Sequence, residues 1–296
     1  MQTKFRYRLM IHIVLILLCA TFVIPLVYVI ALSVTPENLI RNGGYKLIPR
    51  EIDFTAYKII FKKPTQLLDS YKITIAYSFL GTFLSVTVMS MIAYALSRKQ
   101  FYYRQGVTFF VYFTMLFSGG LVPSYIINTQ YLGLSNSFWA YIFPSLVAPY
   151  YVLLLRTFFR NLPESLAESA KIDGASEMTI FLKIALPLSK PAIATVSFII
   201  LLAKWSDWNV SLLYILDSEK YSLQYLLQKV LREASLMQDL AKDPATAHLS
   251  SQLNGVAPVE SMRFAMAILA AGPMMVIFPF FQKYFTKGLT IGAVKE

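Results

Sequence analysis

Long apolar stretches separated by short charged segments dominate the pattern of this chain. A helix that crosses a bilayer needs about 20 mostly apolar residues. Six stretches meet that need, and the predicted spans are Leu9–Leu32, Ile73–Leu96, Val107–Ile126, Phe138–Leu155, Ala192–Leu216 and Phe264–Phe281. The pattern therefore predicts an all-α integral membrane protein with six transmembrane helices.

Two of these spans need comment. The first has a basic start like a signal peptide, but its apolar core is too long for one, so we interpret it as an anchor helix. The charge-free stretch between Gln105 and Leu155 is too long for one crossing. It contains turn-prone pieces at Ser118–Gly120, Pro123 and Asn128–Asn136. We therefore expect two spans there, joined by an outer hairpin.

The two long segments predicted to lie outside, residues 34–72 and 217–263, are expected to contain short helices at Asp53–Phe61 and Ser222–Leu240. The second of these places apolar residues on one face: Leu223, Leu226, Leu227, Val230 and Leu231. That face either lies against the outer rim of the membrane domain or docks an external partner. The predicted division is an anchor helix with its outer segment at residues 1–72 and a core with five spans at residues 73–296.

Composition agrees with a membrane protein. Hydrophobic residues make up 56% of the 296 residues and charged residues 15%, against about a quarter charged in a soluble domain, and the mean hydropathy is +0.55. Lys and Arg gather in the short segments predicted inside, which places both termini in the cytoplasm. The net charge of +11 therefore follows membrane topology and does not indicate nucleic acid. A single cysteine, Cys19, excludes a disulfide framework.

A charged insert runs from Asn161 to Pro191, between the fourth and fifth spans. Asn161 is expected to cap a helix that ends near Ile172, because Glu164 follows three residues later as in a capping box. Gly174 is expected to stop this helix, and Ser176 to cap a second one. The product is a cytoplasmic helix–turn–helix elbow. It either lies on the membrane surface as an amphipathic loop or contacts another subunit.

The insert resembles a known family. Its residues reproduce the spacing of the EAA loop, E-A-A-x3-G-x9-I-x-L-P, at Glu168, Ser169, Ala170, Gly174, Ile184, Leu186 and Pro187. That loop marks permease subunits of binding-protein-dependent ABC importers. Ser169 in place of the first Ala is the one departure, and a small side chain preserves close packing.

The resemblance extends beyond the loop, from Ile73 onward. IDGAS, LPLSKP and the ending KYFTKGLTIGAVKE are similar to the carbohydrate-uptake branch, the ending to the maltose permease's second subunit. FSGGLVPSYIINTQYLGL and SLQYLLQKVL resemble permeases for complex oligosaccharides, of the lipo-oligosaccharide, alginate and rhamnogalacturonan type. The final Glu296 replaces the family's usual Gly.

The resemblance implies one permease of a heterodimer in a bacterial cytoplasmic membrane, with two ATP-hydrolysing subunits and an external sugar-binding protein. ATP and Mg²⁺ belong to the ATPase, and no cofactor is expected in this chain. Glu168 would contact the ATPase, Ala170 would allow close approach, and Gly174 would set the bend. Asp173 would cap the elbow or meet a basic ATPase residue.

Ionisable residues within a span usually face protein or water, and the fifth span contains AKWSDWN. A sugar path would use Lys204, Trp205, Asp207, Trp208 and Asn209, because Trp faces suit the C–H side of a sugar ring. The alternative is a Lys204–Asp207 pair three residues apart beside an interfacial Trp belt. Further candidates for the path are Tyr125, Asn128, Tyr150 and Tyr151.

Other chemistry finds little support. His12 and His248 have no ligand-type neighbours in sequence, so no metal site is expected, and a P-loop pattern is absent. Two other classes remain as alternatives to the importer permease: a self-powered secondary carrier and an intramembrane enzyme. A carrier would often show internal repeats, and an enzyme would need a catalytic pair within the spans; neither is evident.

Overall fold

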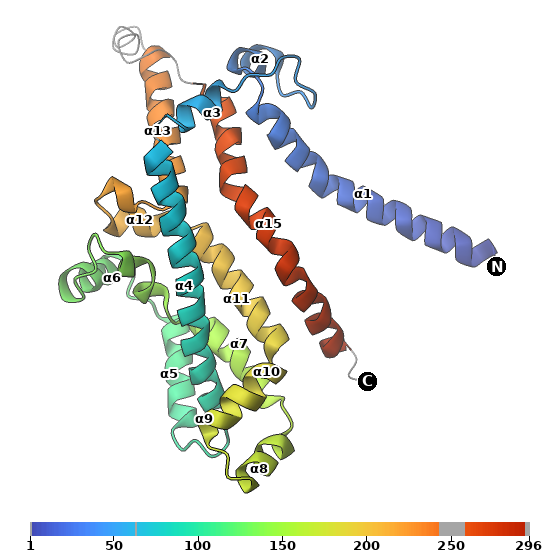
Figure 1. Cartoon of the computed structure of the whole chain (residues 1–296), viewed down its shortest axis with the longest axis vertical. Helices are drawn as coiled ribbons and strands as arrows, with labels where there is room; N and C mark the ends of the chain where they lie inside the picture. Colours follow the sequence, from blue (N-terminus) through green and yellow to red (C-terminus); the bar gives the residue numbers. More distant parts are fainter. Residues whose placement is uncertain (1, 63, 243–257, 294–296) are drawn as a thin grey trace. The chain divides into compact units, whose positions relative to one another are not determined.

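All the regular secondary structure in the part that the structure describes is helical. The computed structural model describes the backbone of residues 2–62, 64–242 and 258–293, and the side chains of residues 10–62, 64–240 and 258–282. The long helices are α1 (Gln2–Ser33), α4 (Pro64–Ser97), α5 (Arg104–Leu116), α7 (Pro149–Arg160), α11 (Lys190–Trp205), α13 (Leu223–Lys242) and α15 (Val259–Ala293). Figure 1 shows their order.

Short helices connect the long ones. They are α2 (Glu37–Gly43), α3 (Thr55–Ile60), α6 (Leu121–Ile126), η1 (Ile127–Tyr131), η2 (Phe138–Tyr141), η3 (Phe143–Ser145), α8 (Glu164–Ile172), α9 (Glu177–Ile180), η4 (Phe181–Ala185), α10 (Leu186–Leu188), α12 (Asn209–Tyr214) and η5 (Ser218–Lys220). The predicted outer helices are confirmed as α3 and α13. Leu223, Leu226 and Leu227 are buried on the predicted apolar face of α13.

Three helical segments are long and apolar enough to cross a bilayer: Met10–Ser33, Pro64–Ser97 and Val259–Gln282. Three further pairs qualify only when a bent pair counts as one span: Arg104–Leu116 with Leu121–Tyr131, Phe138–Ser145 with Pro149–Arg160, and Glu177–Leu188 with Lys190–Trp205. The described residues thus supply up to six crossings, in agreement with the predicted fold class.

Three predicted spans are wrong as continuous helices. The span predicted over Phe138–Leu155 consists of η2, η3 and the start of α7, with a bend of 55° between Ser145 and Pro149. The helix predicted over Val107–Ile126 ends at Leu116, and the chain turns by 112° before it continues. Gly120 takes a φ of +87° at this break, a conformation that glycine adopts without strain. The helix predicted to reach Leu216 ends at Trp205, and the separate helix α12 follows it.

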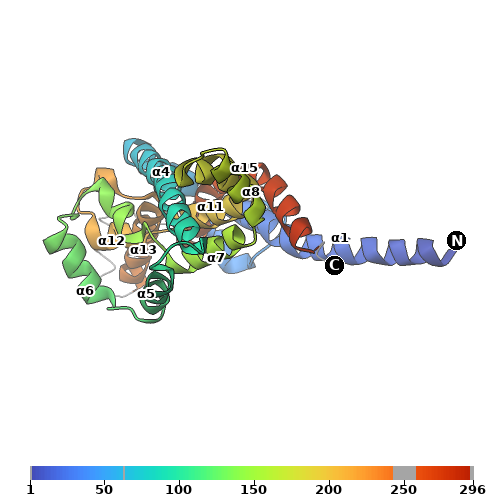
Figure 2. The same ribbon diagram turned by 90° about the horizontal axis from the view of Figure 1, so that it is seen from below.

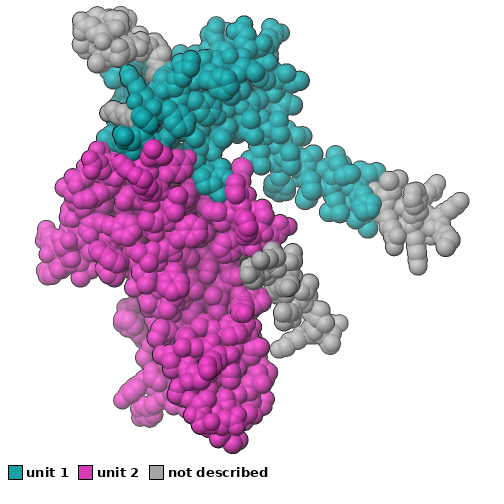
Figure 3. Space-filling model, in the orientation of Figure 1, with its two compact units in different colours: residues 1–67, 226–273 teal, residues 68–225, 274–296 magenta. Residues whose placement is uncertain are grey.

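The chain forms two compact units (Figure 3). Unit 1 comprises residues 1–67 and 226–273. Within it Glu37, in the first turn of α2, accepts hydrogen bonds from the backbone N–H groups of Glu260 and Ser261, at 3.0 and 3.1 Å. This carboxylate lies at the positive end of α15, where a negative charge is favourable. Arg41 completes the contact with a 2.9 Å ion pair to Glu37.

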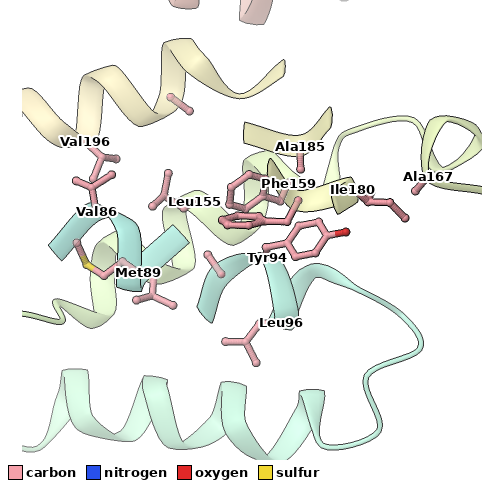
Figure 4. Packing of buried hydrophobic residues seen from close by; sticks show 14 of the residues in the cluster. Val86, Met89, Tyr94, Leu96, Leu155, Phe159, Ala167, Ile180, Ala185 and Val196 are labelled. Atoms are coloured by element: carbon pink, nitrogen blue, oxygen red, sulfur yellow. The ribbon is translucent and has the colours of Figure 1, made fainter. Parts of the chain in front are cut away.

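Unit 2 comprises residues 68–225 and 274–296 and contains the candidate site. Its described side chains form two cores. One core joins the inner half of α4 to α7, η4 and α11 (Figure 4), and includes Met89, Leu155, Phe159, Phe181 and Val196. The other gathers Tyr77, Tyr141, Tyr214 and Tyr221. Within unit 2, α6 projects away from α7 and α11 in both ribbon views (Figure 1, Figure 2).

The hairpin of unit 2 that the sequence predicts to lie outside is held by Asn136. Its backbone has a φ of +55°, and its side-chain oxygen accepts hydrogen bonds from the N–H groups of Leu216 and Asp217. Its amide nitrogen donates to Asp217, 2.7 Å away. Lys220 forms an ion pair with Asp217 as well. The hydrogen bond from Lys220, and to a smaller extent the one from Asn136, holds the pKa of the Asp217 carboxyl below its usual value.

Replacing Asn136 with Ala is expected to destabilise the protein by about 1–3 kcal/mol, because three side-chain hydrogen bonds are lost and Ala is strained at positive φ. Asn136→Gly loses the same bonds without the strain and should be the milder change. Thermal unfolding in detergent measures both. Equal midpoints for Asn136→Ala and wild type would show that this contact does not hold the hairpin.

Candidate functional site

The insert after α7 forms the predicted helix–turn–helix elbow, which we call the coupling loop (residues 161–191). Its first helix, α8, ends in a hydrogen-bonded turn in which the Ala175 N–H donates to the Ala170 carbonyl at 2.9 Å and the Gly174 N–H to the Lys171 carbonyl at 3.0 Å. These two bonds define a Schellman motif, which needs a left-handed residue just past the helix. Gly174 fills this place with a φ of +80°, so the predicted stop is confirmed.

The caps of the loop are partly as predicted. Ser176 accepts a hydrogen bond from the Thr179 N–H at 3.2 Å and caps α9, as expected. Asn161 does not cap α8. It lies at the C-terminal end of α7, and α8 begins at Glu164 after Pro163, without a side-chain cap. Pro163 takes an extended backbone conformation (ψ 124°) and is the residue directly before α8. Asn161 is therefore two residues too early to be the N-cap that the sequence suggested.

The coupling loop has an inward and an outward side. Ala167 and Ile180 are buried in the inner core, and Ala170, Ala175 and Ile184 pack against it. The outward side exposes four of the residues that the EAA spacing singled out, Glu168, Ser169, Gly174 and Pro187. Asp173, next to Gly174, is exposed as well. Ile172 is 87% exposed beside them. A charged surface with an exposed apolar side chain is suited to contact with another protein.

The link from the coupling loop to α11 is bent rather than straight. Ile184 lies within the π-helix η4, and Pro187 lies in the first turn of α10. Around Ser189 the chain turns by 80° into α11. Proline removes a backbone donor and disfavours a continuous helix, so the two prolines at 187 and 191 account for the break.

Two contacts from the coupling loop to α4 and the residues just after it, one ion pair and one hydrogen bond, were not predicted. Glu164 and Lys99 lie 2.8 Å apart. Glu177 accepts a hydrogen bond from the Tyr94 hydroxyl at 2.9 Å and pairs with Lys171 at 2.6 Å. The sequence did contain a signal for these contacts, because acidic residues occur in the first turns of two short helices and basic residues follow the second span. The hydrogen bond and charge of Lys99 hold the pKa of Glu164 below its usual value.

The fifth span contains a buried charge. Lys204 is only 6% exposed, and its ammonium donates to the Ser145 hydroxyl at 2.7 Å and to the Tyr141 carbonyl at 3.5 Å. Its stem lies against Gly81, where an added Cβ would come within 3.1 Å of it. The predicted ion pair with Asp207 does not form, because helix α11 ends between the two residues and Asp207 turns to another partner.

That partner is the backbone of α12. The Asp207 carboxylate accepts hydrogen bonds from the N–H groups of Asn209 and Val210, at 2.7 and 3.3 Å. Trp205 is buried, whereas Trp208 is partly exposed and Asn209 is exposed. Within this group, Asn209 and Trp208 are therefore the accessible candidates for the path, and Lys204 and Trp205 are part of the packing.

The four remaining candidates divide into two groups. Tyr125 stacks on Tyr214 with ring centroids 5.8 Å apart, and the Asn128 amide donates to the Tyr214 hydroxyl at 3.0 Å. Tyr150 and Tyr151 contact each other on α7, and Tyr151 packs against the inner core. The structure joins the first pair through a residue that the sequence analysis had not singled out, Tyr214. Among the described side chains, no cluster of three or more His, Cys, Asp or Glu residues could hold a metal ion.

Comparison with known proteins agrees with this geometry. A family model described as the binding-protein-dependent transport system inner membrane component matches residues 87–291. The chain belongs to that family. It is therefore a non-catalytic transport subunit, a permease of an ABC importer, and a multi-pass protein of the inner membrane. Family membership also implies an ATPase and a binding protein as partners.

Individual relatives cover almost the whole permease. It is 36% identical over 290 residues, 98% of each chain, to the polygalacturonan/rhamnogalacturonan transport system permease protein YtcP of Bacillus subtilis. It is 36% identical over 276 residues to the protein LplC of the same organism, covering 93% of this chain and 90% of LplC. A solved structure of a bacterial ABC transporter involved in import of the acidic polysaccharide alginate superimposes with a TM-score of 0.76 at 25% identity, over 96% of this chain and 98% of the other.

Gly174→Ala is expected to destabilise the coupling loop of the permease by about 1–2 kcal/mol, the cost of a left-handed L-residue. An added Cβ at Gly174 meets nothing within 4 Å, so the effect would come from φ alone. Gly106→Ala is the matched control, because it also meets nothing and has ordinary helical φ. It should leave the protein unchanged or slightly more stable. Thermal unfolding in detergent distinguishes the two, and equal effects would refute the explanation from φ.

Proposed function

We propose that this permease imports oligosaccharides released from complex, acidic polysaccharides, and that ATP hydrolysis in a partner subunit drives the transport. The observation that carries the cargo proposal is the 36% identity, over 98% of both chains, to a permease named for polygalacturonan and rhamnogalacturonan. The likeness to a transporter of the acidic polysaccharide alginate supports the same class of cargo.

The coupling loop is the contact for the ATPase in this proposal. Glu168 and Asp173 offer two exposed carboxylates to basic groups of the ATPase, and Ser169 allows a close approach on the same side. Ala170 and Ile184 pack against the inner core and so hold the loop in place. Gly174 sets the turn between the two helices, and Pro187 sets the turn toward α11.

The assembly is a heterodimer of this chain and a second permease in the lipid bilayer, with two ATPase subunits that bind ATP and Mg²⁺ and one external sugar-binding protein. Both termini lie in the cytoplasm, and residues 1–72 and 73–296 divide the chain into an anchor with its outer segment and a core. The side chains of the ending, residues 283–296, lie outside the described part.

The path for the sugar passes the break between α11 and α12. Trp208 and Asn209 present an aromatic face and an amide at this break, and Asp207 accepts hydrogen bonds beside them. Tyr125 lines it from α6 and Tyr150 from α7, and the buried Asn128 of η1 reaches it through its hydrogen bond to Tyr214. Lys204, Trp205 and Tyr151 hold these elements in place. A break in a spanning helix is a common feature of substrate sites in transporters.

Replacing Glu168 with Ala is expected to abolish the stimulation of ATP hydrolysis by loaded binding protein. The measurement uses the complex of both permeases and the ATPase in nanodiscs, with acidic and neutral oligosaccharides compared. Stimulation by acidic sugars in the wild type, lost in Glu168→Ala, supports the proposal. Stimulation by neutral sugars alone would overturn the acidic cargo, and full stimulation in Glu168→Ala would overturn the assigned contact.

Asp207→Asn is expected to change the ratio of uptake of two different oligosaccharides by roughly threefold or more, the effect of one altered hydrogen bond. Asparagine keeps the ability to cap α12, so stability should stay near wild type. Asn161→Ala, in an exposed residue before α8, is the control and should leave the ratio unchanged. Uptake ratios that equal wild type for every sugar tested would remove Asp207 from the path.

A further inference from the structure

The inner end of α4 is held by both short helices of the coupling loop. Lys99, just after α4, pairs with Glu164 in the first turn of α8 at 2.8 Å. Glu177, in the first turn of α9, accepts from the Tyr94 hydroxyl at 2.9 Å. The Glu177–Tyr94 contact therefore gives the loop a non-covalent route to α4 in addition to its covalent continuation into α11, whereas the Glu164–Lys99 pair, exposed on both sides, adds little to it.

Tyr94 takes part in two contacts at once. The residue is 9% exposed, and its ring lies in an aromatic cluster with Phe159 of α7 and Phe181 of η4, with centroids 5.9 and 5.1 Å away. Figure 4 shows the Tyr94 ring beside Phe159, with the hydroxyl at the edge of the cluster. That hydroxyl reaches Glu177. One side chain therefore connects the inner core to the surface of the coupling loop.

Glu177 collects contacts from two directions. Its Oε1 pairs with Lys171 of α8 at 2.6 Å, and its Oε2 accepts from Tyr94 and lies 3.6 Å from Arg98 Nε. Arg98 in turn lies over the Tyr94 ring, 5.6 Å from its centroid. The carboxylate thus links α8, on one side of the Gly174 turn, to α4. A displacement of α8 would pull on this group directly.

Of the two connections, the covalent link from the coupling loop to α11 is less rigid than the contact through Tyr94 to α4. It passes a π-helix and turns by 80° at Ser189, and a helix interrupted in this way transmits force poorly along its axis. The route through Tyr94 starts at the Glu177 carboxylate, whose side chain is half exposed, and continues through the buried, close-packed side chains of Tyr94 and Phe181. Packed interiors resist compression and pass displacement on. Arg156 of α7 strengthens the receiving end, because it donates to the Leu96 carbonyl of α4 at 3.1 Å.

We propose that Glu177 and Tyr94 are positioning residues that transfer movement of the coupling loop to α4, so that the second span moves together with the fifth. This rests on the proposed function, in which the ATPase moves the coupling loop. Neither residue needs to touch the ATPase or the sugar. Their effect is on the yield of transport for each ATP hydrolysed.

The experiment compares Tyr94→Phe, Glu177→Ala and the double variant in the assembled complex. Sugar uptake and ATP hydrolysis are measured in the same proteoliposomes, and co-purification of the ATPase reports assembly. Both single variants should lower the sugar transported per ATP at least about fivefold, the lower range of typical coupling between sites. The double variant should be no worse than the worse single, because both changes break one contact.

Two conservative variants separate positioning from stability. Tyr94→Phe keeps the buried ring and should assemble and unfold like wild type. Glu177→Gln keeps an oxygen that can accept the Tyr94 hydroxyl, so it should recover a large part of the yield that Glu177→Ala loses. Glu164→Gln is the matched control: its pair with Lys99 is exposed on both sides, and exposed pairs contribute little, so the yield should stay near wild type.

A parallel Glu168→Ala variant separates the two proposals. Loss of coupling in Glu168→Ala with a normal yield in Tyr94→Phe and Glu177→Ala would overturn the positioning role and leave the ATPase contact intact. Normal coupling in all three would remove the coupling loop from the mechanism. Loss of ATPase co-purification in Glu177→Ala would identify Glu177 as a direct contact, which also overturns the positioning role. Additive losses in the double variant would show that Tyr94 and Glu177 act separately.

Discussion

A bilayer provides no water to an unpaired peptide group, so each helix break within a membrane protein requires other groups to take up the freed donors and acceptors. The break between α11 and α12 meets this need with side chains. The Tyr77 hydroxyl donates to the Lys204 carbonyl at 2.7 Å, and the Ser222 hydroxyl donates to the Asp207 carbonyl at 3.2 Å. On the other side of the break, the Asp207 carboxylate accepts from the first N–H groups of α12. The break is therefore stable, and it leaves Trp208 and Asn209 accessible.

The same hydrogen bonds explain how unit 2 is connected. Tyr77 of α4 stacks on Tyr141 of η2 at 4.4 Å, and the Tyr141 hydroxyl lies 2.6 Å from that of Ser211 in α12. Ser211 and Ser222 are bonded in turn. A buried polar network of this kind is costly when incomplete and rigid when satisfied. It holds α4, η2 and α12 in one arrangement around the candidate path.

At the other end of unit 2 the contacts are of a different kind. The inner core is apolar and aromatic, and the coupling loop covers it with small residues such as Ala167 and Ala185. Small side chains allow close packing, which makes the loop part of the core rather than a free segment. In the proposed mechanism, a push on its exposed side reaches α4 and α7 as well as α11. The permease thus combines a buried polar network around the candidate path with a closely packed apolar region under the coupling loop.

Local features of the sequence were sufficient to predict the fold class, the turn of the coupling loop and the family. Hydrophobic length predicted six crossings. The positions of Gly174 and Ser176 predicted the turn and the second cap, because these depend on backbone conformation within a few residues. The motif spacing identified the family.

The partners of Lys204, Asp207, Tyr94 and Glu177 depended on tertiary structure, since each contact joins residues brought together by helix packing or by a helix that ends early. The three-residue spacing of Lys204 and Asp207 implied a pair only if the helix continued, and Asn161 would have been a cap only if α7 had ended sooner. Such breaks are decided by which side chains can satisfy the freed backbone groups, and those side chains come from distant parts of the chain.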